Sequence, residues 1–314
     1  MAVAELAGPR VAARRDLVGF GYLAAMILIG STTATAAKFA VRELPAALLP
    51  LVRFGGAGLC LLPIAWRGGG LARLARADGW RLLATAALCV PINQAFFLNG
   101  AKLTTSAHIG LIYAACPLVV LALACVLGQE RLTRGRLAGV LASVAGVAII
   151  GLGGLRQSGS AGAGVLWGDL LEIGAVISWG AYLTVNKPLV ARHGAVTTLV
   201  GTFLAGALLQ LPVAVLAMPA WPSLGAASPA AWRGLAFLTL IVSVFGLTFQ
   251  NQALRRFDAS QVAAVGNLAP LLTVAWGGLL LGEEVTPTLI LGGALTLGGV
   301  LWAASARREV APVP

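Results

Sequence analysis

Residues 117–133 read PLVVLALACVLGQERLT, and residues 270–286 read PLLTVAWGGLLLGEEVT. The two stretches are identical at six of seventeen positions, and most of the other positions exchange one apolar residue for another. A fixed offset of 153 positions separates them, which is about half of the 314-residue chain. This echo predicts that the chain contains one structural unit twice.

Composition predicts that the repeated unit lies in a membrane. Hydrophobic residues make up 59% of the chain and charged residues only 11%, far from the mixture expected of a soluble domain. Apolar runs of about 20 residues recur, and each is long enough to cross a bilayer as a helix. Because lipid offers no partner for a free backbone N–H, these spans must be helical. We therefore expect an all-α, multi-pass membrane protein.

The pattern predicts ten transmembrane helices, arranged as two five-helix repeats. The expected spans are 17–41, 45–66, 80–101, 104–128, 135–154, 164–187, 195–217, 230–254, 259–282 and 286–305. The expected divisions are an N-terminal tail at 1–16, a first repeat at 17–154, a linker at 155–163, a second repeat at 164–305 and a C-terminal tail at 306–314.

The distribution of Lys and Arg predicts the orientation. With the N-terminus in the cytoplasm, most of the 22 basic residues fall in cytoplasmic segments, whereas Arg42, Lys102, Arg156 and Arg233 fall on the outer side. This asymmetry is the positive-inside pattern. It also accounts for the net charge of +11, so lipid rather than nucleic acid is the expected partner. Both termini are expected in the cytoplasm.

An odd number of spans per repeat inverts the second copy relative to the first. Glu130 is then expected at the cytoplasmic end of its span, and the equivalent Glu283 at the outer end of the ninth span. The regions around 30–38 (GSTTATAAK) and 179–187 (WGAYLTVNK) agree more loosely, and each ends in Lys. Inverted repeats are the architecture of secondary transporters, which bind substrate near the midplane between the halves.

The repeat extends to glycines at the same offset. Gly139 and Gly146 match Gly292 and Gly299, and in each copy the two glycines are seven residues apart on one helix face. Small residues on one face let two helices approach closely. We expect these faces to pack inside the bundle rather than to form a dimer interface.

The chain resembles the EamA-type transporters of the drug/metabolite transporter superfamily. The resemblance rests on WGAYLTVNK at 179–187, LVRFGGAGLCLL at 51–62 and the two echoed stretches, and it covers nearly the whole chain. It implies a carrier of a bacterial-type inner membrane, often an exporter of amino acids or other small metabolites. Small multidrug relatives carry an acid within the first span, whereas this chain has only Asp16 at its entrance. That departure counts against proton-driven efflux of cationic drugs.

Polar and aromatic side chains within the spans are candidates for a substrate cavity, because such groups are costly in lipid and usually face the bundle interior. Several lie close to Pro91, Pro117 or Pro270, each of which removes one helical hydrogen bond. The alternative role of the amides, hydrogen bonding between helices, is equally compatible with the sequence. The candidate substrate-binding residues are Trp179, Tyr182, Tyr113, Asn93, Gln94, Asn267, Gln250, Asn251, Thr32 and Thr33.

Charged residues within the spans are few. Arg53 can neutralise a substrate carboxylate or serve the fold; we favour the fold, because the resembling family has an Arg there as part of its structure. Lys38 and Lys187 can reach the interface with their long stems. The candidates for proton coupling are Glu172, Asp169 and His108, near the outer ends of their spans. The two acids can alternatively cap and solvate that end, and His108 can be an interfacial residue.

Other function classes find little support. The two histidines are far apart in the sequence, and each of the four cysteines lies singly within a span, so no metal, cofactor or enzymatic activity is expected. A channel suits the apolar composition, but inverted repeats with prolines in matching spans favour alternating access.

We therefore predict a secondary transporter or exporter of small amphipathic or zwitterionic metabolites, most of all amino acids, bound between the two repeats. A facilitator or channel-like pore is the main alternative, and a multidrug efflux carrier is the weaker one. The sequence leaves open the substrate, import or export, a proton as coupling ion, and monomer or homodimer.

Overall fold

A computed structural model of the chain describes residues 9–66, 69–126, 133–158, 162–221, 224–257, 262, 265–266 and 268–305. Every regular element among these residues is helical. The helices are α1 (Pro9–Gly30), α2 (Thr33–Val41), α3 (Leu48–Trp66), α4 (Gly70–Ala87), α5 (Asn93–Leu103), α6 (Ser106–Tyr113), α7 (Cys116–Val126), α8 (Arg134–Ser158), α9 (Gly162–His193), α10 (Ala195–Ala217), α11 (Pro229–Phe237), α12 (Leu247–Leu254), α14 (Ala269–Leu281) and α15 (Pro287–Ser305). Two π-helical segments, η1 (Leu88–Ile92) and η5 (Leu238–Gly246), and two short 3₁₀ turns, η3 (Met218–Ala220) and η4 (Leu224–Ala226), complete the set.

The described residues include six helical stretches that are long and apolar enough to cross a membrane. They are Leu17–Val41, Leu48–Trp66, Gly70–Leu103, Ser106–Leu123, Ala195–Ala217 and Pro229–Leu254. Three shorter apolar helices follow the same pattern, at Leu137–Ile150, Ala269–Leu281 and Pro287–Trp302. The predicted all-helical class is confirmed, whereas the count of ten spans stays a prediction.

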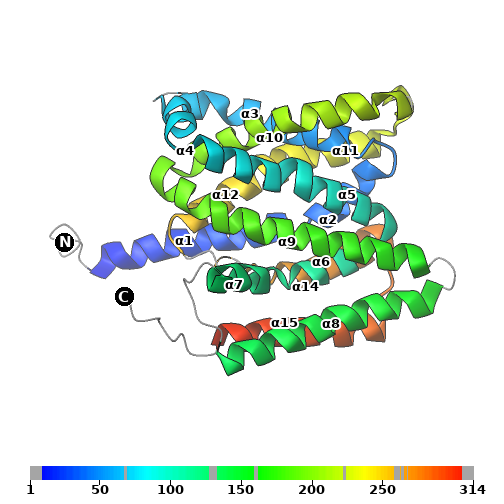
Figure 1. Cartoon of the computed structure of the whole chain (residues 1–314). Coiled ribbons are helices and arrows are strands. Elements are labelled where there is room, and N and C mark those ends of the chain that lie inside the picture. The colour runs from blue at the N-terminus through cyan, green and yellow to red at the C-terminus, as the bar shows by residue number, and fades with distance from the viewer. Residues whose placement is uncertain are drawn as a thin grey trace.

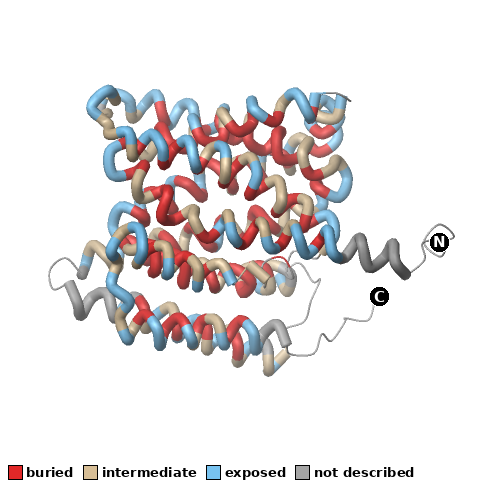
Figure 2. Tube along the Cα trace, turned by 180° about the vertical axis from the view of Figure 1, so that it is seen from behind, coloured by how far each residue is buried: buried red, intermediate tan, exposed pale blue. Residues whose placement is uncertain are grey.

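The outer surface of the bundle is apolar. Leu216 and Leu279 are 81% and 76% exposed, and many other leucines and valines point outward. Figure 2 shows the buried positions gathered where helices pack on one another, with exposed positions on the outer faces and at the helix ends. A soluble domain rarely exposes apolar patches this large. The surface is suited to lipid.

The first predicted span is interrupted in its middle. Helix α1 begins at Pro9, eight residues before the expected span, and a turn at Ser31 and Thr32 separates it from α2. The Thr32 hydroxyl donates to the Ile29 carbonyl at 2.6 Å, and the Ser31 hydroxyl donates to the Leu28 carbonyl at 2.9 Å. Hydroxyl groups that bond the preceding turn bend helices, which accounts for the break.

The third and eighth spans, which are equivalent in the two repeats, each contain a π-helical segment. In the third span the π-helix η1 contains Pro91. The Leu88 carbonyl accepts a hydrogen bond from the backbone N–H of Asn93 and another, at 3.0 Å, from the hydroxyl of Ser178 in α9. Because Pro91 has no N–H to donate, it is tolerated in this irregular segment, and the Ser178 hydroxyl gives the Leu88 carbonyl a second donor. Such π-segments often accompany functional sites.

Equivalent helices of the two halves pack against each other. Figure 1 shows α8 and α15 side by side at one edge of the bundle, with α3 and α10 in contact at the opposite edge. Helices α6 and α14, which contain or adjoin the two echoed stretches, also pack together. This arrangement is the one expected if a pseudo-two-fold axis relates the halves.

A pair of lysines supports the same relation in atomic detail. Lys38 Nζ donates to the carbonyl oxygen of Thr104 at 2.6 Å, and Lys187 Nζ donates to that of Phe257 at 2.8 Å. Positions 104 and 257 differ by 153, the offset of the two echoed stretches. The loosely matched segments that end in Lys38 and Lys187 therefore make equivalent contacts in the two halves.

The repeated glycines meet at the contact between α8 and α15. A Cβ atom at Gly299 would lie 2.5 Å from the backbone nitrogen of Ser143 and 2.6 Å from the carbonyl oxygen of Gly139. A Cβ atom at Gly292 would lie 2.7 Å from the carbonyl oxygen of Gly146. Backbone cannot yield as a flexible side chain does, so only glycine permits this approach. The glycines thus pack within the chain, as predicted.

We expect Gly299→Ala to destabilise the protein by about 1–3 kcal/mol, because the added methyl group overpacks the helix contact. The matched control is Gly298→Ala, since a Cβ atom there has no neighbour within 4 Å. Unfolding in mixed detergent micelles, followed by circular dichroism, measures the difference. Equal stability of the two variants would mean that the helices are not this close.

Candidate substrate-binding cavity

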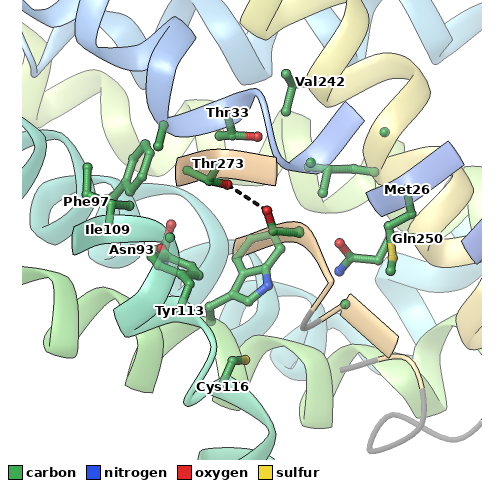
Figure 3. A pocket seen from close by; sticks show the side chains of 18 of the residues that line it. Met26, Thr33, Asn93, Phe97, Ile109, Tyr113, Cys116, Val242, Gln250 and Thr273 are labelled. Atoms are coloured by element: carbon green, nitrogen blue, oxygen red, sulfur yellow. Dashed lines mark hydrogen bonds between the residues drawn. The ribbon is translucent and has the colours of Figure 1, made fainter. Parts of the chain in front are cut away.

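A cavity of about 210 Å³ lies between the two halves. Its walls come from α1, α2, α3, α5, α6 and α7 of the first half and from α9, η5, α12 and α14 of the second. Figure 3 shows the labelled side chains converging on it, with Asn93 and Phe97 on one side and Met26 and Gln250 on the other. Contributions from so many elements make the cavity a property of the whole bundle.

One part of the wall is aromatic and apolar. Trp179 lines the cavity and packs on Tyr182 behind it, with ring centroids 4.8 Å apart. Phe97 and Tyr113 meet edge to face at 6.1 Å, and Ile109 adjoins them. Aromatic faces supply apolar contact and attract cations.

The polar part of the wall is a chain of side-chain hydrogen bonds that begins at Arg53. The guanidinium of Arg53 donates through Nε to the Ser243 hydroxyl at 2.8 Å and through Nη1 to Gln94 Oε1 at 3.3 Å. Gln94 Nε2 donates to Asn93 Oδ1 at 2.8 Å. Asn93 Nδ2 in turn donates to the Tyr113 hydroxyl at 3.3 Å and to the Ala175 carbonyl at 2.8 Å.

The structure brings six of the ten candidate residues to this cavity. They are Thr33, Asn93, Gln94, Tyr113, Trp179 and Gln250. Gln250 is 7% exposed, and its amide nitrogen has no hydrogen-bond partner among the described residues. It is therefore available to a bound solute.

Three other candidates lie elsewhere, and Asn267 falls outside the described residues. Tyr182 has no exposed surface and supports Trp179 from behind. Asn251 is also fully buried; it accepts from Asn186 Nδ2 at 3.0 Å and donates to the Ala195 carbonyl at 3.3 Å. Thr32 lines a separate surface groove beside Trp276. Asn251 thus has the role of bonding between helices that the sequence left open.

Arg53 and Thr273 line the cavity although the sequence did not assign them there. Arg53 was attributed to the fold. Thr273 is equivalent to Val120 in the first echoed stretch. This change from an apolar to a polar residue is the feature of the sequence that could have indicated Thr273 as a cavity residue. Its hydroxyl donates to the carbonyl oxygens of Ser31 and Ala269, each at 3.0 Å, so it also supports the break between α1 and α2.

The three candidates for proton coupling lie together at one end of α6 and α9. His108 Nδ1 is 3.0 Å from Asp169 Oδ2, and Asp169 Oδ1 accepts from the Thr104 hydroxyl at 2.5 Å. Glu172 lies one turn along α9, is fully buried, and has no hydrogen-bond partner for either oxygen among the described residues. It packs so closely on α5 that a Cβ atom at Gly100 would lie 2.5 Å from its Oε1.

At the same end, an ion pair joins the two halves. Lys38 Nζ of α2 is 3.0 Å from Glu283 Oε1, which follows α14. Glu283 also accepts from the first backbone N–H groups of α6, at 2.9 Å from Ser106 and 3.3 Å from Ala107. A carboxylate is favourable at a helix N-terminus. We call this group of Lys38, Glu283 and the α6 N-terminus the clasp.

A second connection at this end holds the turn after α2. Glu43 accepts from the backbone N–H of Ser228 at 2.6 Å and from its hydroxyl at 2.7 Å. Both donors stabilise the ionised carboxyl group and hold the pKa of Glu43 below its usual value. Ser228 is also the N-cap of α11, so the two halves are joined here again.

The opposite end has its own polar cluster. Asp78 interrupts α4 with non-helical backbone angles and is 5% exposed. Its carboxylate lies 2.9 Å from Arg81 Nη1, 3.0 Å from Arg192 Nη1 and 2.8 Å from His193 Nε2. The cluster connects α4 of the first half to the C-terminal end of α9 in the second.

Comparison with known proteins agrees with this architecture. The model of the EamA-like transporter family matches residues 17–152 and 166–305. A crystal structure of a protein with 24% sequence identity superposes with a TM-score of 0.65, covering 95% of this chain and 99% of that one. The fold is therefore shared with a solved structure.

Two curated relatives are named as a transporter and as a probable exporter. An uncharacterized transporter of Archaeoglobus fulgidus is 26% identical over 88% of this chain and 94% of its own. A probable terminal-alkyne amino-acid exporter of Streptantibioticus cattleyicolor is 28% identical over 61% of each chain. Since the family model matches nearly the whole of both halves, the chain belongs to the EamA-like transporter family and is a membrane transporter.

Proposed function

We propose that this transporter carries amino acids or similar amphipathic or zwitterionic metabolites across an inner membrane, bound in the cavity between its halves. The observation that carries the proposal is the cavity itself, with aromatic walls on one side and Arg53 with its amide chain on the other. The relative named as a probable amino-acid exporter supports the same substrate class.

The size of the cavity favours a small metabolite over a drug. Its volume of about 210 Å³ corresponds to roughly seven water molecules at about 30 Å³ each. Sites for drug-sized ligands are larger, at about 300–1,000 Å³. Multidrug efflux is thus the weaker alternative.

The clasp supports alternating access rather than an open pore. In the proposed orientation, with both termini in the cytoplasm, the clasp lies at the outer end of the bundle. It joins α2 and α6 of the first half to the residues after α14 of the second, so opening that end requires breaking the ion pair of Lys38 with Glu283. A contact that closes one end, and that can break when the halves move, is what opening the cavity to one side at a time requires.

The first test is saturable counterflow of amino acids in proteoliposomes, with Trp179→Ala as the diagnostic variant. Loss of the indole removes an aromatic wall worth about 1 kcal/mol or more, so we expect apparent affinity to fall at least about fivefold. Trp167→Ala is the control, because Trp167 lies on the same helix and is 63% exposed. Unchanged transport by Trp179→Ala would place the substrate elsewhere.

Breaking the clasp should open the outer end of the cavity. In a variant whose only cysteine is Cys116, which lines the cavity, we expect Lys38→Ala or Glu283→Gln to increase labelling by a membrane-impermeant thiol reagent in right-side-out vesicles. Glu284→Gln is the matched control, since the neighbouring Glu284 is exposed. Increased labelling only in inside-out vesicles would reverse the proposed orientation.

Glu172 is the proposed coupling residue if a proton drives transport, because among the described residues its buried carboxyl group has no hydrogen-bond partner, whereas Asp169 is already bonded to His108 and Thr104. We expect Glu172→Gln to flatten the dependence of transport on an imposed pH gradient, and Asp169→Asn to do so less. Glutamine keeps the shape of the side chain and cannot titrate. Wild-type transport that ignores the gradient would instead identify a facilitator.

A further inference from the structure

The guanidinium of Arg53 is a buried cation on the cavity wall, and none of the described residues gives it an anionic partner. The residue is 4% exposed, and its two hydrogen bonds go to neutral acceptors, the Ser243 hydroxyl and the Gln94 amide oxygen. The face of the Phe54 ring lies 4.7 Å from its central carbon. Removing a charge from water without pairing it costs several kcal/mol, so a buried cation normally has an anion.

The acidic side chains of the described residues do not provide that anion. Asp78 pairs with Arg81, Arg192 and His193; Asp169 pairs with His108; Glu283 pairs with Lys38; Glu43 bonds Ser228; and Glu284 is exposed. Glu172 is buried beside Gly100 and makes no hydrogen bond to Arg53 or to any other described residue. Within the described part of the chain, the charge of Arg53 is therefore left for a ligand.

The hydrogen bonds along the polar wall run in one direction, with donor and acceptor fixed at each amide. A guanidinium has only donors, so the Gln94 atom that faces Arg53 must be the oxygen. The Gln94 nitrogen then donates to the Asn93 oxygen, which leaves the Asn93 nitrogen to donate to the Tyr113 hydroxyl. Because the Tyr113 oxygen accepts this bond, its own hydrogen remains available to another acceptor. Both ends of this series of hydrogen bonds, the Arg53 guanidinium and the Tyr113 hydroxyl, thus present donors.

We infer that Arg53 and the Tyr113 hydroxyl form a subsite for the carboxylate of the transported solute, with Gln94 and Asn93 as positioning residues. Both Arg53 and Tyr113 line the cavity, and the solute's carboxylate would supply the anion that the buried guanidinium lacks. Charge-assisted hydrogen bonds are the strongest kind available to such a group. The inference deepens the proposed function and rests on it, because it makes a carboxylate, rather than an amphipathic character alone, the required feature of the substrate.

The rest of the cavity fits the remainder of such a solute. Gln250 lies opposite Asn93 and offers an amide nitrogen without a partner among the described residues. Trp179 and Phe97 provide apolar and aromatic surface for a side chain and for an ammonium group. A small α-amino acid with an apolar side chain meets all three features.

The test compares carboxylic acids with their amides, in which a neutral group replaces the carboxylate, on the purified wild-type protein. The panel pairs alanine, leucine and tryptophan with alaninamide, leucinamide and tryptophanamide, so that side-chain size varies while the ammonium group is kept. A further pair, 4-methylpentanoate and its amide, lacks the ammonium group. Isothermal titration calorimetry measures each affinity. We expect at least one acid to bind about tenfold or more tightly than its amide, the discrimination that one hydrogen bond to a charged group provides. Equal binding within every pair, or no binding of any acid, would overturn the inference.

Gln94→Glu provides an internal competitor, because it places a carboxylate within hydrogen-bonding distance of Arg53. We expect this variant to fold, to lose the preference for acids and to bind acids and amides alike. Gln210→Glu is the matched control: Gln210 is also a buried glutamine, but it donates to the Ala47 carbonyl beside a different groove, and the preference should persist there. A preference for acids that survives in Gln94→Glu would show that the carboxylate does not bind at Arg53.

The proposed transport function and the proposed carboxylate subsite can be contradicted separately. Binding with acid preference but without counterflow in proteoliposomes would contradict the proposed transport and leave the subsite in place. Counterflow of solutes with no preference for acids would contradict the subsite and leave the transport function in place. If Gln94→Glu does not fold, the comparison of acids with amides on the wild-type protein still decides the question.

Discussion

The structure depends on one constraint, which is that lipid supplies no hydrogen-bond partners to a polypeptide backbone. Every described element is accordingly helical, and at two of the irregular points a side chain from another helix donates to a backbone carbonyl group. At the break between α1 and α2, the Thr273 hydroxyl donates to the Ser31 carbonyl. At the π-helix around Pro91, the Ser178 hydroxyl donates to the Leu88 carbonyl. These interruptions occur beside the central cavity, where side chains from other helices can reach the exposed carbonyl groups.

The same constraint divides the charged groups of the bundle into those that are paired and those that are not. At the helix ends, Lys38 pairs with Glu283 and Asp78 with Arg192 and His193, each across the two halves. Arg53 and Glu172, in contrast, form no ion pair with any described residue. Paired charges hold the halves together, whereas unpaired ones are costly unless a ligand or a proton meets them. In the proposed function, the paired charges take part in the conformational cycle, Arg53 meets the solute and Glu172 is the candidate for proton coupling.

Duplication explains how a small chain forms a site between its halves. The contacts of Lys38 with Thr104 and of Lys187 with Phe257 are equivalent, and the glycines of α8 and α15 meet where the repeats pack. The cavity, however, is asymmetric, because Thr273 replaces an apolar residue and no second arginine is among the described residues that line it. Duplication thus provides two similar halves, and divergence of single side chains makes the cavity between them asymmetric.

The sequence by itself determined the helical class, the membrane environment, the internal repeat, the family and the glycine contact, because each follows from composition or from a repeated pattern along one chain. It also indicated Trp179, Tyr113, Asn93 and Gln250 for the cavity, since polar and aromatic groups in lipid must face inward. Only the tertiary structure decided that Arg53 lines that cavity, that Asn251 bonds between helices and that Glu283 pairs with Lys38. The physical reason is that a side chain's role depends on which groups from distant helices surround it, and the spacing along one helix does not contain that information.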